Sequence, residues 1–98
     1  MLVKIHKSYR NVVAVCDSEL IGKKFEEDKF QLDLKETFFG GKEVSDKEAI
    51  DIMRKMSRED ATFNIVGKKS VDAAVRAEVI SEEQVGEIKN VPFALILG

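Results

Sequence analysis

The sequence predicts an α+β fold, a mostly antiparallel small sheet of about four strands with two main helices packed on one face. Two observations carry this prediction. Runs rich in β-branched residues stand at both ends of the chain, and apolar residues recur at helical spacing in its later middle. The length of 98 residues fits a single compact domain, residues 1–98, without a linker or low-complexity tract.

Two β-rich runs near the start, Leu2–His6 and Val12–Cys16, are separated by a short polar joint and predict an antiparallel hairpin. The first run alternates apolar and polar residues, so we expect one of its faces to be solvated. The second run is apolar almost throughout, which predicts a central strand buried on both faces.

Residues 17–22 predict one turn of helix, because Asp17 or Ser18 can accept hydrogen bonds from its free N–H groups. Gly22 suits the left-handed position that closes such a turn. Residues 25–29 are predicted as a polar bend. Residues 30–34 then alternate, which predicts a strand with one buried face.

A first long helix is predicted to begin at Ser45, since Ser45 followed by Glu48 three residues later matches a capping box. Its buried stripe is predicted to consist of Ala49, Ile50, Met53 and Met56.

A second long helix is predicted over residues 60–79, and we expect this stretch to organise both the core and any working surface. Its apolar stripe is Phe63, Val66, Val71, Ala74 and Val75. A short capped helix is then predicted from Ser81, limited by Gly86. A last strand is predicted over residues 91–97, with Pro92 at its beginning, where the missing N–H matters least.

Charge is dense and balanced, with 16 basic and 18 acidic residues and a net charge of −2. Such mixed charge is typical of heat-adapted proteins, in which it forms surface ion-pair networks, and this predicts a thermophilic or archaeal source. The net charge argues against nucleic-acid binding over the whole surface but allows a local basic face.

The chain has one cysteine, so no internal disulfide can form, and a reducing compartment is expected. No apolar run is long enough to cross a bilayer, and the N-terminus lacks the apolar block of a signal peptide. We therefore expect a cytoplasmic protein with no membrane partner. One histidine and one cysteine cannot close a zinc site, and we expect no metal and no cofactor.

Gly67, Lys68 and Lys69 form the first candidate site, since a helix N-terminus with cationic side chains binds anions. The segment is similar to the end of a phosphate-binding loop, but Thr62 stands where that loop needs a glycine. It is also similar to the second half of a helix-hairpin-helix motif, but that motif needs a glycine where Ile65 stands. The alternative is an ordinary helix start with solvated lysines.

A second lysine doublet, Lys23 and Lys24, also follows a glycine. If the two doublets share one side with other basic residues, the local potential there would be positive despite the net charge. Tyr9, Phe38 and Phe39 could then stack on exposed bases. The basic residues concerned are Lys4, Lys7, Arg10, Lys23, Lys24, Lys42, Lys68 and Lys69. The alternative is a generic salt-bridged surface with the phenylalanines in the core.

Cys16 is the one candidate nucleophile, because it ends an apolar strand and precedes a helix start that could lower its pKa. The alternative, a small buried core residue, is the more usual place for a free cysteine. No pair of carboxylates stands out from an apolar setting as a general acid and base. We therefore nominate no catalytic residue.

Four phrases in order along the chain resemble the small archaeal family called Domain of Unknown Function 424. They are residues 17–22, residues 38–41, residues 61–67, and Asn90-Val91-Pro92 before a last strand. The resemblance implies an archaeal cytosolic protein with an α+β fold and no established activity. Members usually have Gly-Val-Pro followed by His, whereas this chain has Asn90 and Phe93 there, so no role of that histidine is carried over.

Our leading hypothesis is a non-enzymatic module that binds RNA or a ribonucleoprotein. The residues assigned to this anion or nucleic-acid site are Asn64, Gly67, Lys68, Lys69, Lys23 and Lys24. The second hypothesis is a protein-interaction domain or homodimer that uses a sheet edge or the Phe38-Phe39 turn. The third is an enzyme for a small anionic substrate bound at the Gly67 helix N-terminus, with Cys16 or Asp17 doing chemistry.

Overall fold

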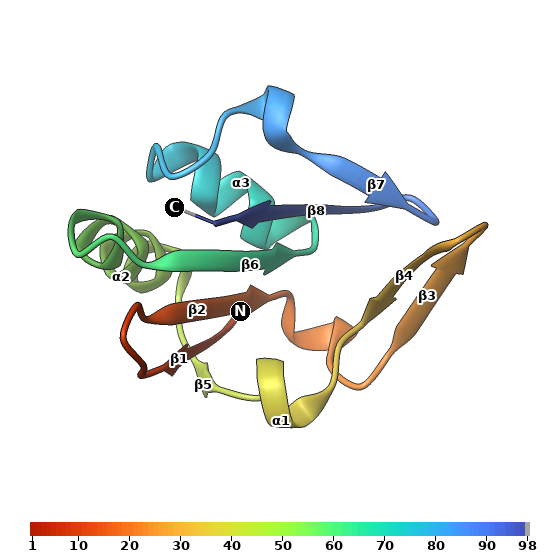
Figure 1. Ribbon diagram of the computed structural model, residues 1–98, viewed down its shortest axis with the longest axis horizontal. Helices are drawn as coiled ribbons and strands as arrows, with labels where there is room; N and C mark the ends of the chain where they lie inside the picture. Colours follow the sequence, from red (N-terminus) through yellow and green to blue (C-terminus); the bar gives the residue numbers. More distant parts are fainter. Residues whose placement is uncertain (98) are drawn as a thin grey trace.

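The computed structural model describes residues 1–97, and its main feature is a mixed sheet of six strands (Figure 1). Across the sheet the strands are β5 (Lys42–Glu43), β1 (Leu2–His6), β2 (Val12–Cys16), β6 (Thr62–Val66), β8 (Val91–Ile96) and β7 (Gly86–Ile88). β2 and β6 run parallel, and every other neighbouring pair is antiparallel.

A separate two-stranded hairpin and a set of helices complete the fold. The hairpin consists of β3 (Lys24–Glu27) and β4 (Phe30–Asp33). The helices are α1 (Glu36–Phe39), α2 (Asp46–Arg58) and α3 (Lys68–Arg76), with 3-10 turns η1 (Ser18–Leu20) and η2 (Glu82–Gln84). The α+β class is confirmed, but the prediction of about four strands is wrong. The extra strands are short, as in β5 and β7, or belong to segments predicted as bend or helix.

The first hairpin and the central place of β2 are confirmed. Leu2 pairs with Cys16 and His6 with Val12, and four of the five residues of β2 are buried. The register follows from the short polar loop that joins the two strands. Alternate residues of β2 therefore face opposite sides of the sheet, and both sides are covered along most of its length.

The prediction of one helix over residues 60–79 is wrong. Residues Thr62–Val66 form a strand, Gly67 turns with φ of 112°, and α3 follows from Lys68 to Arg76. Phe63 and Val66 fit the spacing of a helical stripe, but the segment also fits the period of two residues that is typical of a strand. Phe63 and Ile65 lie on one face of this strand, in the core cluster under the helices. β-branched and aromatic residues favour the strand, and its pairing with β2 decides the choice.

Helices α2 and α3 cover one face of the sheet, as predicted. Ser45 caps α2 by accepting from the Glu48 N–H at 3.1 Å, and Ala49, Met53 and Met56 are buried beneath it. Ile50 is half-buried against the same cluster. This side of the sheet holds the larger apolar core.

The opposite face is covered only in part, by α1 and by the β3–β4 hairpin. A smaller apolar cluster lies under them, made of Ala14, Cys16, Leu34, Phe39 and Val66. The hairpin stands out from one end of the sheet (Figure 1), and its turn is held by the Lys89 N–H, which donates to the Glu27 carboxylate at 2.9 Å. Residues 24–27, of which 25–27 were predicted as bend, are thus a strand.

The C-terminal elements agree with the sequence patterns. Ser81 and Gln84 form the capping box of η2, and β8 begins at Val91 with Pro92 as its second residue.

Phe30 differs from expectation, because its side chain is 68% exposed although its strand was predicted to bury this face. Within residues 1–97, no helix has the length and apolar character that crossing a membrane requires.

Candidate functional site

The N-terminus of α3 is filled by a side chain of the protein itself. Asp17, which follows β2, is buried, and its carboxylate accepts from the Lys69 N–H at 3.2 Å and the Ser70 N–H at 2.8 Å. The Ser70 hydroxyl donates to the same carboxylate at 2.8 Å. Negative charge at a helix N-terminus is stabilised by the helix dipole. Asp17 therefore takes the place that the sequence suggested for an external anion.

This arrangement corrects one part of the sequence-based site. The backbone N–H groups of Lys69 and Ser70 are engaged by Asp17, so they are not free for a phosphate. What remains are the side chains of Lys68 and Lys69, which line a small recess of about 230 Å³ beside η1. Hydrogen bonds from the N-terminal ammonium group and Ser18, together with the charge of Lys69, lower the pKa of Glu43. Lys69 thus already has a nearby acidic neighbour.

The other lysine doublet lies at the base of the β3–β4 hairpin. The Leu34 N–H donates to the Lys23 carbonyl at 2.9 Å, and Lys24 is the register partner of Asp33. The Lys24 ammonium lies 3.5 Å from the Glu26 carboxylate. Both doublets therefore follow the carboxyl ends of the parallel strands β2 and β6. They share this end of the sheet, but of the four lysines in the doublets Lys68 and Lys69 line the recess and Lys23 and Lys24 do not.

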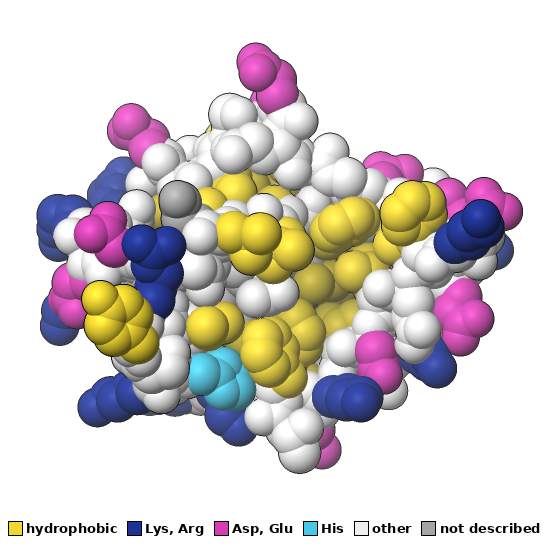
Figure 2. All heavy atoms as spheres, in the orientation of Figure 1, with side chains coloured by type: hydrophobic (Ala, Val, Ile, Leu, Met, Phe, Trp, Pro, Cys, Tyr) yellow, Lys and Arg dark blue, Asp and Glu magenta, His cyan; other side chains and the backbone are white. Residues whose placement is uncertain are grey.

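Asn64 lies in a different place, on the open face of the sheet. It lines a groove of about 350 Å³ whose floor is β6 and β8 and whose walls are α1 and β4. Figure 2 shows apolar side chains gathered in this hollow, with the histidine at one rim and charged side chains around the outside. The lining residues are Gln31, Leu32, Asp33, Leu34, Phe38, Phe39, Asn64, Ile65, Val66, Phe93, Ala94 and Leu95.

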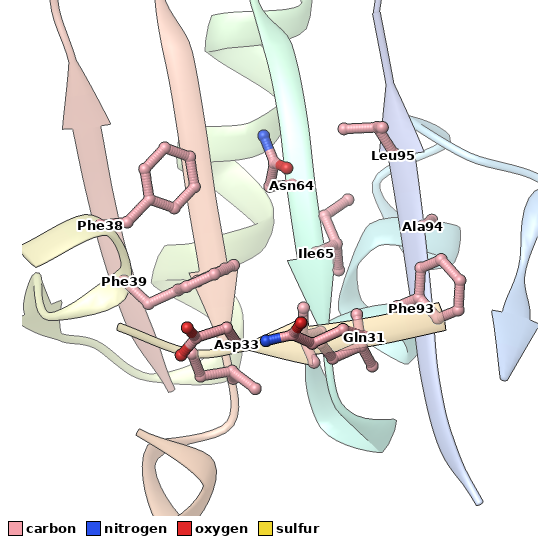
Figure 3. A pocket seen from close by; sticks show the side chains of 12 residues that line it. Gln31, Asp33, Phe38, Phe39, Asn64, Ile65, Phe93, Ala94 and Leu95 are labelled. Carbon is pink, nitrogen blue, oxygen red and sulfur yellow. The ribbon is translucent and has the colours of Figure 1, made fainter. Parts of the chain in front are cut away.

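The Asn64 side chain stands in the groove between an aromatic and an aliphatic side chain. Figure 3 shows Phe38 on one side of it and Leu95 on the other, with Phe93 further along β8, where it pairs with Val66. Asn64 is half-buried, and its amide forms no hydrogen bond with any other part of residues 1–97. Its strand partner Leu95 is 53% exposed. The groove therefore offers a free donor and acceptor between apolar and aromatic surfaces.

The wall formed by α1 is held firmly in place. The Phe38 ring stacks on His6 with ring centroids 4.6 Å apart, and Phe39 meets Phe38 edge to face at 5.0 Å. His6 Nε2 lies 2.8 Å from the Phe38 carbonyl, and the Lys4 ammonium donates to the Thr37 carbonyl at 2.8 Å. The aromatic wall is thus tied to β1, and it is preorganised rather than mobile.

The opposite wall adds two polar side chains, Gln31 and Asp33 of β4. Neither side chain forms a hydrogen bond or ion pair with the rest of residues 1–97. Sequence reasoning missed both of them and also Phe93 and Leu95. The alternation of residues 30–34 was visible, but nothing local indicates that this strand leaves the main sheet. The one signal at Phe93 was its replacement of a histidine usual in the resembling family.

Cys16 lies beneath this face and is fully buried. Burial, with a smaller effect from the Asp17 carboxylate, raises its pKa from 9.0 to about 11. The side chain is therefore a protonated thiol at neutral pH and a poor nucleophile. Within residues 1–97, no cluster of three histidine, cysteine, aspartate or glutamate side chains could hold a metal ion.

Comparisons with known proteins agree on the family and the fold. The family model described as Protein of unknown function (DUF424) matches residues 6–98. The crystal structure of an uncharacterized conserved protein from Methanopyrus kandleri matches with a TM-score of 0.87 and 26% sequence identity, over 97% of this chain and 88% of that chain. A comparison with curated proteins gives no match. The chain therefore belongs to the family described as Protein of unknown function (DUF424), as the resemblance predicted.

Proposed function

We propose that this protein is a non-enzymatic binding module that takes an unpaired base of single-stranded RNA, free or in a ribonucleoprotein, into the groove. One observation supports this most strongly. The Asn64 amide is free of internal partners and stands beside Phe38, in a groove that also carries the Phe93 ring further along β8 (Figure 3). Single-stranded RNA is recognised by stacking of bases on aromatic rings and by hydrogen bonds to the base edges.

The chemistry of the groove favours a flat occupant with polar edges. A purely apolar side chain placed here would cover the Asn64 amide without replacing its bonds to water, at a cost of about 1–3 kcal/mol. A base avoids this cost because its edge carries donors and acceptors while its faces are apolar. Asp33, on the opposite wall, can accept only, which favours a base with an amino group.

The two lysine doublets supply the phosphate contacts in this proposal. Lys23 and Lys24 border the hairpin end of the groove, and Lys68 and Lys69 line the recess beyond the end of β6. Phosphate contacts position a nucleic acid without reading its sequence. Gly67 has a structural role in this proposal rather than a contact with phosphate, since it lets the chain turn into α3 beside Asp17. The net charge of −2 implies that binding is weak and depends strongly on salt.

A homodimer is the second candidate function, and the exposure of Leu95 and Leu97 favours it. These side chains are 53% and 72% exposed at the end of β8. Exposed apolar residues that continue an apolar groove are typical of protein contact surfaces. In that case the occupant of the groove would be a second copy of this chain, and sedimentation would show a mass that rises with concentration and falls in Leu95→Lys.

Fluorescence anisotropy of a labelled single-stranded RNA tests the first proposal. Asn64→Leu and Phe93→Leu should each weaken binding by roughly tenfold, within the range for a lost base contact or stacking platform. Phe30→Leu is the matched control, because Phe30 is an exposed aromatic that does not line the groove. If the native chain fails to bind, or if Asn64→Leu binds with native affinity while remaining folded, the base-binding proposal is wrong.

A further inference from the structure

The loop between β1 and β2 presents an aromatic side chain with no internal role. Tyr9 is fully exposed, at 109% of its reference area. Its neighbour Arg10 is oriented, because Nη1 donates to the Leu97 carbonyl at 3.4 Å, while the Ser8 hydroxyl donates to the Arg10 carbonyl at 2.5 Å. Full exposure leaves both the ring and the hydroxyl of Tyr9 available to a partner outside the fold.

This loop lies at the other end of the same strands that form the groove. The Thr62 N–H, at the start of β6, donates to the Asn11 carbonyl at 2.9 Å. The Leu97 carbonyl accepts the hydrogen bond from Arg10. Leu97 comes just after β8 and two residues after Leu95, which lines the groove. β6 has five residues, so it is about 16 Å long at the usual rise per residue. Tyr9 and Arg10 thus flank the groove at one end, and the lysine doublets flank it at the other.

We infer that the RNA-binding surface continues from the groove along β8 to a second base site, where Tyr9 stacks on a base and Arg10 contacts the adjoining phosphate. This inference rests on the proposed function. The order of chemical groups along the strands carries it: lysines, then the aromatic groove with Asn64, then Arg10 and Tyr9. Cations and aromatic platforms that alternate along a track are the general design of single-strand binding.

Acidic residues limit the direction of approach at the second site. Glu59 and Asp60 line a recess with Tyr9 and Arg10, and no ion pair joins them to Arg10 among the described residues. Their charge repels phosphate on the side of α2. Approach from the side that leads to the groove avoids these carboxylates. Such a track suits about four nucleotides, the lower end of site sizes for small single-strand binders.

Tyrosine emission gives a direct test, because the chain has one tyrosine and no tryptophan. Single-stranded tetranucleotides should quench the emission of Tyr9 by stacking, beyond the absorption effect measured on free tyrosine amide. The corresponding mononucleotides should occupy the groove and leave the emission unchanged. Their binding is followed instead by the NMR signals of the Asn64 side-chain amide.

Variants separate the second site from the groove. Tyr9→Ala should weaken tetranucleotide binding by roughly fivefold to tenfold, the value of one stacked base, and leave mononucleotide binding unchanged. Tyr9→Phe should restore the affinity, whereas Phe30→Ala, the matched exposed aromatic, should change neither. Asn64→Leu should weaken both ligands.

The possible results show whether the second base site alone is wrong or whether the proposed RNA-binding function is wrong as well. Tetranucleotide binding that is sensitive to Asn64→Leu but unaffected by Tyr9→Ala, without quenching, overturns the second site and leaves the proposed function standing. Quenching by mononucleotides at the same concentration as by tetranucleotides also overturns it, since Tyr9 would then bind nucleotides independently of the groove. Absence of RNA binding by the native chain removes both.

Discussion

The Asp17 carboxyl group lies against Gly67, in space that only a glycine at position 67 leaves free. A Cβ built on Gly67 would lie under 3.0 Å from all three atoms of the Asp17 carboxyl group, closer than real Cβ atoms approach. Gly67 also has φ of 112°, which side chains of L-residues rarely allow. The residue that follows β2 is thereby held against the start of α3.

We predict that Gly67→Ala destabilises the protein by about 3 kcal/mol, from backbone strain and from displacement of the Asp17 carboxylate. Urea unfolding gives the free energy. Gly22→Ala is the matched control, since Gly22 has φ of 80° but nothing within 4 Å of its Cβ position. It should cost only the strain of the left-handed conformation, about 1 kcal/mol. Equal losses in the two variants would show that the Asp17 contact is unimportant.

Asp17 and Ser70 should be energetically coupled. Asp17→Ala should cost about 2 kcal/mol, because it leaves the N–H groups of Lys69 and Ser70 without their acceptor. Ser70→Ala should cost less when Asp17 is already alanine, with an interaction energy of about 1 kcal/mol in a double-mutant cycle. Additive losses would mean that water replaces the carboxylate at little cost.

Cys16 should make stability fall in alkaline solution. Its pKa is raised from 9.0 to about 11, mainly by burial, so the folded chain keeps the thiol proton to higher pH than the unfolded chain. The stability from this group is therefore complete below pH 9.0 and is lost as pH rises through about 11. The loss is on the order of 2–3 kcal/mol over this interval.

Unfolding of native protein and Cys16→Ala at each pH isolates this effect, since the two chains differ only at position 16. Cys16→Ala should itself cost about 1–2 kcal/mol at neutral pH through lost packing. The native thiol should also resist a thiol reagent at neutral pH until the chain unfolds. Rapid labelling of the folded protein, or parallel pH profiles for the two chains, would contradict the assignment of a protonated buried thiol.

Salt dependence should count the lysines that contact phosphate. Each contact on a single strand adds about 0.7 to the slope of log affinity against log salt. The double substitution Lys68→Gln with Lys69→Gln should therefore lower the slope by roughly 1.4, and so should Lys23→Gln with Lys24→Gln. The fold should remain intact, because these side chains lie on the surface.

Lys47 and Lys55 provide the control for charge alone, since both are exposed on α2, which covers the other face of the sheet. Replacing them with glutamine should leave the slope unchanged. A decrease equal to that of the doublets would indicate diffuse attraction to the whole molecule. An unchanged slope in the Lys68 and Lys69 variant would remove that doublet from the binding surface.

Local signals predicted the elements whose stabilising contacts are close in sequence. The β1–β2 hairpin follows from two β-rich runs and a short loop, and α2 follows from the Ser45 cap and the stripe of Ala49, Met53 and Met56. Prediction failed at Thr62–Val66, where helical and strand periods coincide and the parallel partner β2 lies some 50 residues earlier, since Val12 pairs with Thr62.

The candidate site was predicted only in pieces. Asn64, Phe38 and Phe39 were each singled out, but nothing in the chain indicates that they share a groove with Phe93 and that Asn64 faces away from Lys68. Asp17 was expected to cap its own turn and instead caps α3, through bonds that span 52 and 53 residues. A side chain of this kind reaches its partner only after the sheet has formed.

The sequence by itself determined the α+β class, the family, the main helix and the terminal strands, because propensity, capping and alternation act between neighbouring residues. The tertiary structure alone decided that β2 and β6 lie parallel, that Asp17 fills the start of α3, and that the hairpin leaves one face of the sheet open as a groove. The physical reason is that strand pairing and burial join residues distant in the chain, and a local pattern carries no information about which distant partner will complete it.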